Sequence, residues 1–158
     1  MNLVSKLGLA AICSVAAISV GIAQNGPQTP EQKAQSVVKV RQSLFEVQNF
    51  AFQQVVGMLK GAPFNAQEVE TAAKRIQMTS SMIPDVFKVD TSKSNVPTKA
   101  RDVIWTNKAD FEMKAQALNM QAQNLEMVAM SGDRSATLKA IGMTGKACGN
   151  CHDQFKNK

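Results

Sequence analysis

The sequence predicts an all-α fold, an antiparallel four-helix bundle, and three observations lead to it. Apolar residues recur at alternating steps of three and four over four long segments, which is the period of one helix face. Residues that start and end helices bound these segments. No segment shows the sustained alternation of apolar and polar residues that predicts a strand. Amphipathic helices joined by mostly short connections favour a bundle.

The first helix is expected to begin at Pro30. Thr29 is a good N-cap, proline suits the first helical position, and Gln32 stands where it can close a capping box. The helix is expected to end at Gly61-Ala62-Pro63. Its predicted buried stripe consists of Val37, Val40, Leu44, Val47, Ala51, Val55 and Met58.

The second helix is expected to start at Asn65, with Glu68 as the partner in its capping box. It should run to about Ile83, because Pro84 cannot continue a regular helix. Residues 84–100 show no sustained period and contain Asp, Ser, Asn and Pro, so they predict a long surface loop.

The third helix is expected from about Arg101 to Ser131, ending at Gly132, and Asp133 or Ser135 should cap the fourth. The buried face predicted for the third helix consists of Ile104, Phe111, Ala115, Leu118, Ala122, Leu125 and Ala129. The stripe predicted for the fourth consists of Leu138, Ile141, Gly145, Cys148, His152 and Phe155.

Residues 1–23 have the features of an export signal. Lys6 precedes an apolar run over residues 7–20, and the small residues Gly21 and Ala23 stand where a signal peptidase reads, so cleavage is expected before Gln24. The run is shorter than the roughly 20 apolar residues that a membrane-spanning helix needs. We therefore expect residues 24–158 to form one exported domain with no membrane association after cleavage.

Charge and composition exclude several functions. The 18 Lys and Arg against 12 Asp and Glu give a net charge of +6, and the charges are scattered, so a nucleic-acid-binding arm is not expected. The single His and the absence of Tyr exclude a multi-histidine zinc site or a di-iron centre.

The strongest motif is Cys148-Gly149-Asn150-Cys151-His152, because C-x-x-C-H is the attachment sequence of c-type haem. On a helix, residues three and four apart share one face. Both thiols can then form thioethers with one porphyrin edge, while the imidazole of His152 binds the iron. Gly149 keeps the backbone beside that edge free of bulk. The predicted cofactor is one covalently attached haem c.

The context of the motif disfavours two other interpretations. A thiol-exchange C-x-x-C normally sits at the start of a helix, where the thiol pKa is lowered, whereas Cys148 and Cys151 stand at the end of one. A zinc site would need further ligands, and after removal of the signal no Cys or His exists outside the motif. A non-haem redox bundle remains as an alternative.

Four segments together resemble the cytochrome c′ family, the class II c-type cytochromes. They are Val40-Arg41-Gln42-Ser43, the Lys60–Phe64 turn, the Ile104-Trp105 pair, and the run from Gly145 to Lys156 around the motif. Their order and spacing agree with the family's pattern, apart from a one-residue shortening before Pro63. The resemblance covers nearly the whole of residues 24–158 and implies a four-helix bundle with the haem near the last helix.

The resemblance also implies residue roles. Arg41 and Gln42 resemble the pair that holds a haem propionate, and both side chains suit a carboxylate. Thr98 and Lys99 stand where the family places polar contacts to the haem edge. Lys156, one turn beyond the motif histidine, resembles the family's basic residue near the proximal face of the iron.

The family's distal position, which faces the iron from the first helix, falls on Phe45. Members with low-spin iron have a ligating Met there, and Phe has no lone pair to offer. The resemblance therefore implies a periplasmic, non-enzymatic haem protein with five-coordinate, high-spin iron that binds NO and CO, holds O₂ poorly, and can transfer electrons to redox partner proteins. The alternative is a low-spin electron-transfer cytochrome with Met58 or Met82 as sixth ligand.

A homodimer built on the first helix is also expected. That helix carries Phe45, Phe50, Phe52, Val40 and Val56 as well as its predicted core stripe, so apolar groups lie on more than one face. A helix buried on one side needs only a single apolar stripe, and extra apolar surface often marks an interface. The family frequently dimerises through this helix.

Overall fold

The computed structural model describes residues 27–158, so the predicted export signal and its cleavage site before Gln24 lie outside the described residues. The described chain is helical, and its only β pairing is an isolated bridge. The elements in chain order are α1 (Pro30–Val56), the 3₁₀ turn η1 (Gly57–Lys60), α2 (Ala66–Ser81), α3 (Ile83–Val86), α4 (Val103–Thr106), α5 (Lys108–Met130) and α6 (Arg134–Phe155).

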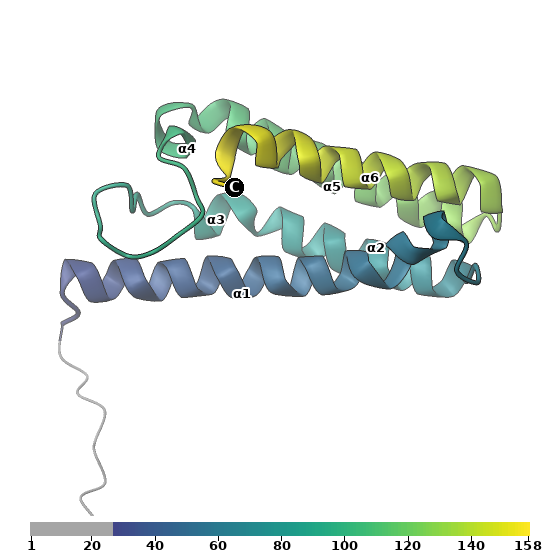
Figure 1. Ribbon diagram of the computed structural model, residues 1–158, viewed down its shortest axis with the longest axis horizontal. Coiled ribbons are helices and arrows are strands. Elements are labelled where there is room, and N and C mark those ends of the chain that lie inside the picture. Colours follow the sequence, from purple (N-terminus) through teal and green to yellow (C-terminus); the bar gives the residue numbers. More distant parts are fainter. Residues whose placement is uncertain (1–26) are drawn as a thin grey trace, which may run out of the picture.

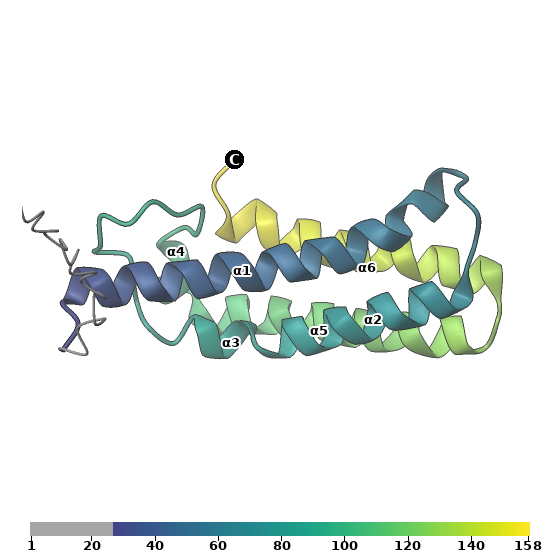
Figure 2. The same ribbon diagram turned by 90° about the horizontal axis from the view of Figure 1, so that it is seen from below.

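The four long helices form a bundle, which confirms the predicted fold class. Figures 1 and 2 show α1, α2, α5 and α6 side by side along the long axis, with successive long helices running in opposite directions. The most extensive contacts are those of α2 with α5, α5 with α6, and α1 with α2. The short helices α3 and α4, the loop between them and the C-terminal end of α6 lie toward one end of the bundle (Figure 1).

The starts predicted for the first, second and fourth helices are confirmed, and of the two predicted capping boxes the one at Thr29 forms. Thr29 and Gln32 close a capping box, in which the Gln32 N–H donates to Thr29 Oγ1 at 3.2 Å and the Thr29 N–H donates to Gln32 Oε1 at 2.9 Å. The side chains of Asn65 and Asp133 accept hydrogen bonds from first-turn N–H groups of α2 and α6. These caps satisfy N–H groups that have no partner within their own helix.

Gly61 and Gly132 follow the ends of helical segments as predicted, whereas two other helix boundaries differ from the prediction. Gly61 and Gly132 have φ of 95° and 75°, the left-handed conformation that favours glycine after a helix. Pro84 does not end α2, which stops at Ser81; it lies in the first turn of the separate α3, where its missing N–H costs nothing. The third predicted helix is interrupted at Asn107 and so forms both α4 and α5.

The buried stripe of α1 was predicted only in part. Its inner face consists of Ala34, Val38, Arg41, Leu44, Gln48, Ala51 and Val55. Val40 and Val47, which the apolar pattern placed inside, are 54% and 52% exposed. The prediction was wrong at these two positions because the inner face includes the polar residues Arg41 and Gln48. A pattern of apolar residues alone selects the neighbouring valines instead.

Two groups of buried residues fill the bundle. The aromatic cluster consists of Leu44, Ala51, Ile76, Ile83, Phe87, Ile104, Phe111, Ala115, Leu118, Ala122 and Phe155. The aliphatic cluster consists of Val55, Met58, Val69, Ala72, Ala73, Leu125, Ala129, Ala140 and Ile141. The buried face predicted for the third helix is confirmed at all of its positions. Within residues 27–158, none of the helices combines the length and the hydropathy that crossing a membrane would require.

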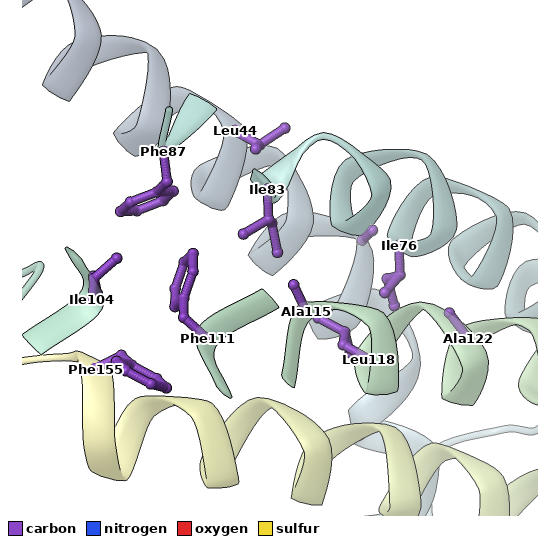
Figure 3. Packing of buried hydrophobic residues seen from close by; sticks show 11 residues of the cluster. Leu44, Ile76, Ile83, Phe87, Ile104, Phe111, Ala115, Leu118, Ala122 and Phe155 are labelled. Carbon is purple, nitrogen blue, oxygen red and sulfur yellow. The ribbon is translucent and has the colours of Figure 1, made fainter. Parts of the chain in front are cut away.

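Figure 3 shows how the aromatic cluster is assembled from several elements. Phe111 of α5 lies between Phe87, which directly follows α3, and Phe155 at the end of α6. The Phe111 ring centroid is 4.8 Å from that of Phe87 and 5.2 Å from that of Phe155, with the second pair edge to face. These contacts join α3, α5 and α6 at the end of the bundle that holds the C-x-x-C-H motif.

Candidate functional site

The motif residues lie in the last two turns of α6. Cys148 and Cys151 are free thiols, both half-buried, and both pack against the aromatic cluster. His152, the next residue, is exposed. The helix therefore brings both thiols to the inner side of α6, whereas His152, which the apolar pattern placed on the buried stripe of this helix, is exposed at the edge of that face.

The environment of the two thiols differs from that of a thiol-exchange pair. Burial raises the pKa of Cys148, and it raises the pKa of Cys151 to about 11 despite the opposing charge of Lys114. Both thiols are therefore protonated near neutral pH. Thiol-exchange motifs need the opposite shift, toward a stabilised thiolate, so the surroundings of this pair disfavour a redox disulfide.

The imidazole of His152 has a lowered pKa, first because the neighbouring protein removes water from it and second because Lys156 carries a positive charge nearby. The Asp153 carboxylate opposes this shift. A neutral imidazole, with a free nitrogen lone pair, is the form of histidine that binds metals. Within the described chain, no group of three or more His, Cys, Asp or Glu side chains forms a metal-binding cluster.

The segment containing Thr98 and Lys99 is attached to the end of α6. The Asn157 N–H donates to the Lys99 carbonyl at 2.8 Å, and an antiparallel bridge joins Ala100 to Lys156. Thr98 is half-buried, and its Oγ1 accepts from the Ala100 N–H at 3.1 Å. The predicted loop contacts, Thr98 and Lys99, therefore lie beside Lys156, immediately after the motif helix.

Arg41 is the most deeply buried charged side chain of the described residues, at 2% exposure. Its guanidinium donates from Nε to the Val86 carbonyl at 2.8 Å, and from its two terminal nitrogens to Thr91 Oγ1 at 2.7 Å and the Val89 carbonyl at 2.5 Å. Burial lowers the pKa of Arg41 to about 10, so the group remains charged at neutral pH. Arg41 thus holds the loop after α3 against α1.

Two aromatic rings complete the surroundings of this arginine. The guanidinium carbon of Arg41 lies 4.3 Å from the centroid of the Phe87 ring and 5.3 Å from that of Trp105. Trp105 Nε1 is buried and has no hydrogen-bond partner among the described residues. A buried N–H without an acceptor is costly, so this donor points to an acceptor that protein groups do not supply.

Phe45 lies one turn beyond Arg41 on α1. Its ring is half-buried against the aromatic cluster, and its centroid is 6.2 Å from that of Phe87. The aromatic cluster and the half-buried residues packed against it include no methionine. Gln42, the other predicted propionate contact, is exposed on α1, and its side chain has no hydrogen bond among those of residues 27–158.

Sequence reasoning missed part of this arrangement. Phe87 falls in the segment predicted as an exposed loop, yet it is buried at the centre of the aromatic cluster. Trp105 enters the sequence analysis only through the Ile104-Trp105 pair, and its unpartnered N–H becomes apparent only when the fold is known. The only sign of this arrangement in the sequence was the presence of isolated aromatic residues in a segment without hydrophobic periodicity.

Two surface hollows of the described structure lie elsewhere. They measure about 650 and 560 Å³ and lie between the C-terminal part of α1 and the start of α2. They share Gln54, Asn65 and Glu68, and no residue of the C-x-x-C-H motif or of the aromatic cluster lines either of them. The chemistry predicted from the sequence therefore lies away from these hollows.

Comparisons with known proteins agree with this geometry. The family model described as cytochrome C′ matches residues 36–156. The cytochrome c′ of Rubrivivax gelatinosus is 33% identical over 131 residues, which cover 80% of this chain and 98% of that protein. The solved nitric oxide complex of a mutant cytochrome c prime from Alcaligenes xylosoxidans is 27% identical, with a TM-score of 0.69 over 79% of this chain and 97% of that one. A cytochrome c′ structure described as having ligand-controlled dimer dissociation is 26% identical, with a TM-score of 0.70 over 79% and 97% of the two chains.

Proposed function

Because this chain belongs to the cytochrome c′ family, whose cofactor is a single covalently attached haem c, we propose that it is a periplasmic gas-binding haem protein with five-coordinate, high-spin iron. It binds NO and CO and can exchange electrons with redox partner proteins. The observation that carries this proposal is the aromatic cluster beside the motif, against which Phe45 packs and which contains no methionine. A bound haem supplies an iron that takes small ligands and single electrons.

Cys148 and Cys151 are the residues that attach the haem, and His152 is the protein ligand of its iron. Both thiols and the imidazole lie within two turns of one helix, and the thiols face the cluster. The intact mass of the purified protein should exceed that of the chain from about Gln24 by one haem, and acid–acetone treatment should not release it. Free extraction of the haem would contradict attachment at these residues. In His152→Ala the attachment should remain while the protein's axial bond is lost.

Arg41 and Trp105 supply the buried donors for a haem propionate, together with the exposed amide of Gln42. Arg41 is held rigidly by the loop after α3, and the Trp105 N–H beside it lacks an acceptor. A carboxylate is the acceptor that both groups favour. Thr98 and Lys99 are proposed as further contacts at the haem edge.

Lys156 is proposed to lie near the proximal face of the iron. It follows His152 by one turn, and its backbone N–H donates to the His152 carbonyl at 3.1 Å. Its positive charge also contributes to the lowered pKa of the histidine. The side chain is exposed, so it can reorient toward the imidazole.

The location of the methionines supports five-coordinate iron. Met58, one alternative ligand, is 4% exposed and belongs to the aliphatic cluster. Met82, the other, is 44% exposed at the end of α2. Either thioether would have to leave its position to reach a haem attached at α6. Phe45 offers no hydrogen-bond donor, so distal stabilisation of O₂ is weak, whereas NO and CO depend on such a donor much less.

A visible spectrum and one pair of variants test the proposal. The purified protein should show a broad high-spin Soret band, whereas sharp low-spin α and β bands would establish a sixth ligand. Phe45→Ala should speed CO association, because it removes the ring that crowds the ligand site. Phe52→Ala, a half-buried phenylalanine on the same helix, is the matched control and should leave CO association unchanged. Equal rates in wild type and Phe45→Ala would place the distal residue elsewhere.

A homodimer through α1 is part of the proposal. Among the apolar residues on which this expectation rests, Val40 and Phe50 are exposed at 54% and 59%, while Phe45 and Phe52 pack inward. Val47, at 52% exposure, lies between Val40 and Phe50 on the same face. Sedimentation equilibrium at micromolar concentration should give the dimer mass, and Phe50→Glu should shift it to the monomer. A monomer mass for the wild type would contradict this interface.

A further inference from the structure

The methionines of this protein are distributed in an unusual way. Methionine ordinarily ranks among the residues most often buried. Residues 27–158 contain eight methionines, of which only Met58 is buried, at 4% exposure. The other seven are between 40% and 70% exposed: Met78, Met82, Met113, Met120, Met127, Met130 and Met143. None of these seven belongs to either cluster of buried residues.

Four of these methionines form a line along the outer face of α5. Met113, Met120 and Met127 are spaced by seven residues, so they lie on one side of the helix, and Met130 continues the line near its end. The exposed positions between Met113 and Met130 are Gln116, Gln123 and Asn124. This face of α5 therefore presents thioethers and amides to water, with no exposed charged side chain between Met113 and Met130.

A thioether exposed to water reacts with two-electron oxidants. The sulfur of methionine attacks hypochlorous acid and gains one oxygen, so the thioether becomes a sulfoxide while the oxidant is reduced to chloride and one proton is released. Methionine sulfoxide reductases reverse the change. The product is polar, which disrupts a packed core but costs little where the side chain is already hydrated.

We propose that the seven exposed methionines are sulfoxidation sites, which together form a reservoir of surface thioethers that consumes hypochlorous acid before the oxidant damages the haem. Oxidation at these positions leaves both clusters intact because the seven side chains lie outside them. Met58 is excluded from the reservoir by its burial. The sites do not depend on the spin state or the gas binding proposed above.

The first experiment locates the sites. Haem-loaded protein is treated with increasing equivalents of hypochlorite and digested, and the methionine-containing peptides are analysed by mass spectrometry. We expect sulfoxide at the seven exposed positions, an unmodified Met58, and an unchanged far-ultraviolet circular dichroism spectrum. Oxidation of Met58 at the same rate as the others, or loss of helix at one or two equivalents, would overturn the proposal. Methionine sulfoxide reductases should restore the original masses.

The second experiment tests protection. The variant Met113→Gln, Met120→Gln, Met127→Gln, Met130→Gln removes four thioethers, and glutamine suits an exposed helix position. Loss of the Soret band should begin about four equivalents of hypochlorite earlier than in wild type, since each thioether consumes one equivalent. The matched control replaces Gln116, Gln123, Asn124 and Ser131 of the same face by Ala and should keep the wild-type threshold. An unchanged threshold in the Met→Gln variant would refute protection, even if the sites themselves are confirmed.

Discussion

The two clusters inside the bundle differ in what they enclose. The aliphatic cluster is built from Val, Leu, Ile, Ala and one Met. The aromatic cluster has three Phe rings at its centre, with Phe45, Trp105 and both motif cysteines packed at its edge. Beside it lie a buried guanidinium, that of Arg41, and a buried N–H without a partner, that of Trp105. Packing alone therefore accounts for the aliphatic cluster. The aromatic cluster lies beside buried polar groups, and packing does not explain the free-energy cost of burying them.

The two clusters therefore contribute differently to the stability of the bundle and to its proposed function. Residues of the aliphatic cluster hold the helices together, and replacing them should change only the free energy of unfolding. Residues of the aromatic cluster pack as well, but they also surround the proposed haem site. Variants in this second cluster should therefore change two independent measurements, the free energy of unfolding and the haem spectrum.

The largest expected effect compares Phe111→Ala with Ile141→Ala. Both side chains are buried, and each substitution leaves a cavity, so we expect losses of about 3–5 kcal/mol for Phe111→Ala and about 2–5 kcal/mol for Ile141→Ala. Urea unfolding followed by circular dichroism measures both. Only Phe111→Ala should also alter the Soret band, because its ring packs against Phe87 and Phe155. A comparable spectral change in Ile141→Ala would show that the two clusters are not functionally distinct.

The next effect concerns Arg41. Replacing Arg41 by Met removes three hydrogen bonds and leaves their buried acceptors in the loop after α3 without a donor, so the free energy of unfolding should fall by about 2–4 kcal/mol. Arg75→Met is the control, because Arg75 is exposed on α2 and makes one surface hydrogen bond to Gln54. The control should change the free energy of unfolding by about 0.5 kcal/mol or less. Equal losses in both variants would mean that the buried contacts of Arg41 are not stabilising.

A smaller effect is expected for Trp105→Phe. The substitution removes the unpartnered N–H and keeps a ring, so the haem-free chain should lose no more than about 1 kcal/mol. In the haem-loaded protein a propionate would lose a donor and keep more of its negative charge. That charge favours ferric over ferrous iron, so spectroelectrochemistry should show a lower reduction potential. An unchanged potential would mean that Trp105 does not contact the propionate.

The contrast between α1 and α5 shows what the sequence could predict. The buried face of α5 is entirely apolar, from Phe111 to Ala129, and its period alone located every buried position. The inner face of α1 includes Arg41 and Gln48, whose burial depends on partners far away in the chain, so the apolar pattern placed Val40 and Val47 inside instead. Hydrophobic periodicity fails where a helix buries polar groups.

The site shows the same limit. The C-x-x-C-H motif is local, so its spacing predicted that Cys148 and Cys151 share a side of one helix. The contact between Arg41 and Phe87 joins residues of α1 to the segment after α3, and it follows only from the folded arrangement. Phe87 lies in a stretch without periodicity, where neither helix nor loop patterns indicate burial.

The smallest expected difference in the free energy of unfolding concerns two glycines of α6, one of which faces α1. A Cβ added at Gly145 would lie 3.1 Å from Phe52 Cζ, whereas one added at Gly142, a single turn earlier, would meet nothing within 4 Å. Alanine is better than glycine within a helix by about 1 kcal/mol, so Gly142→Ala should raise the free energy of unfolding by roughly that amount. Gly145→Ala should gain less, because the Phe52 ring, which packs against both clusters, has to move. Urea unfolding measures both variants, and Phe52→Leu in the Gly145→Ala background should recover part of the difference by giving the new methyl group room. Equal gains at the two glycines would show that the approach of α6 to α1 tolerates a methyl group at Gly145, and that Phe52 does not set the distance between these two helices.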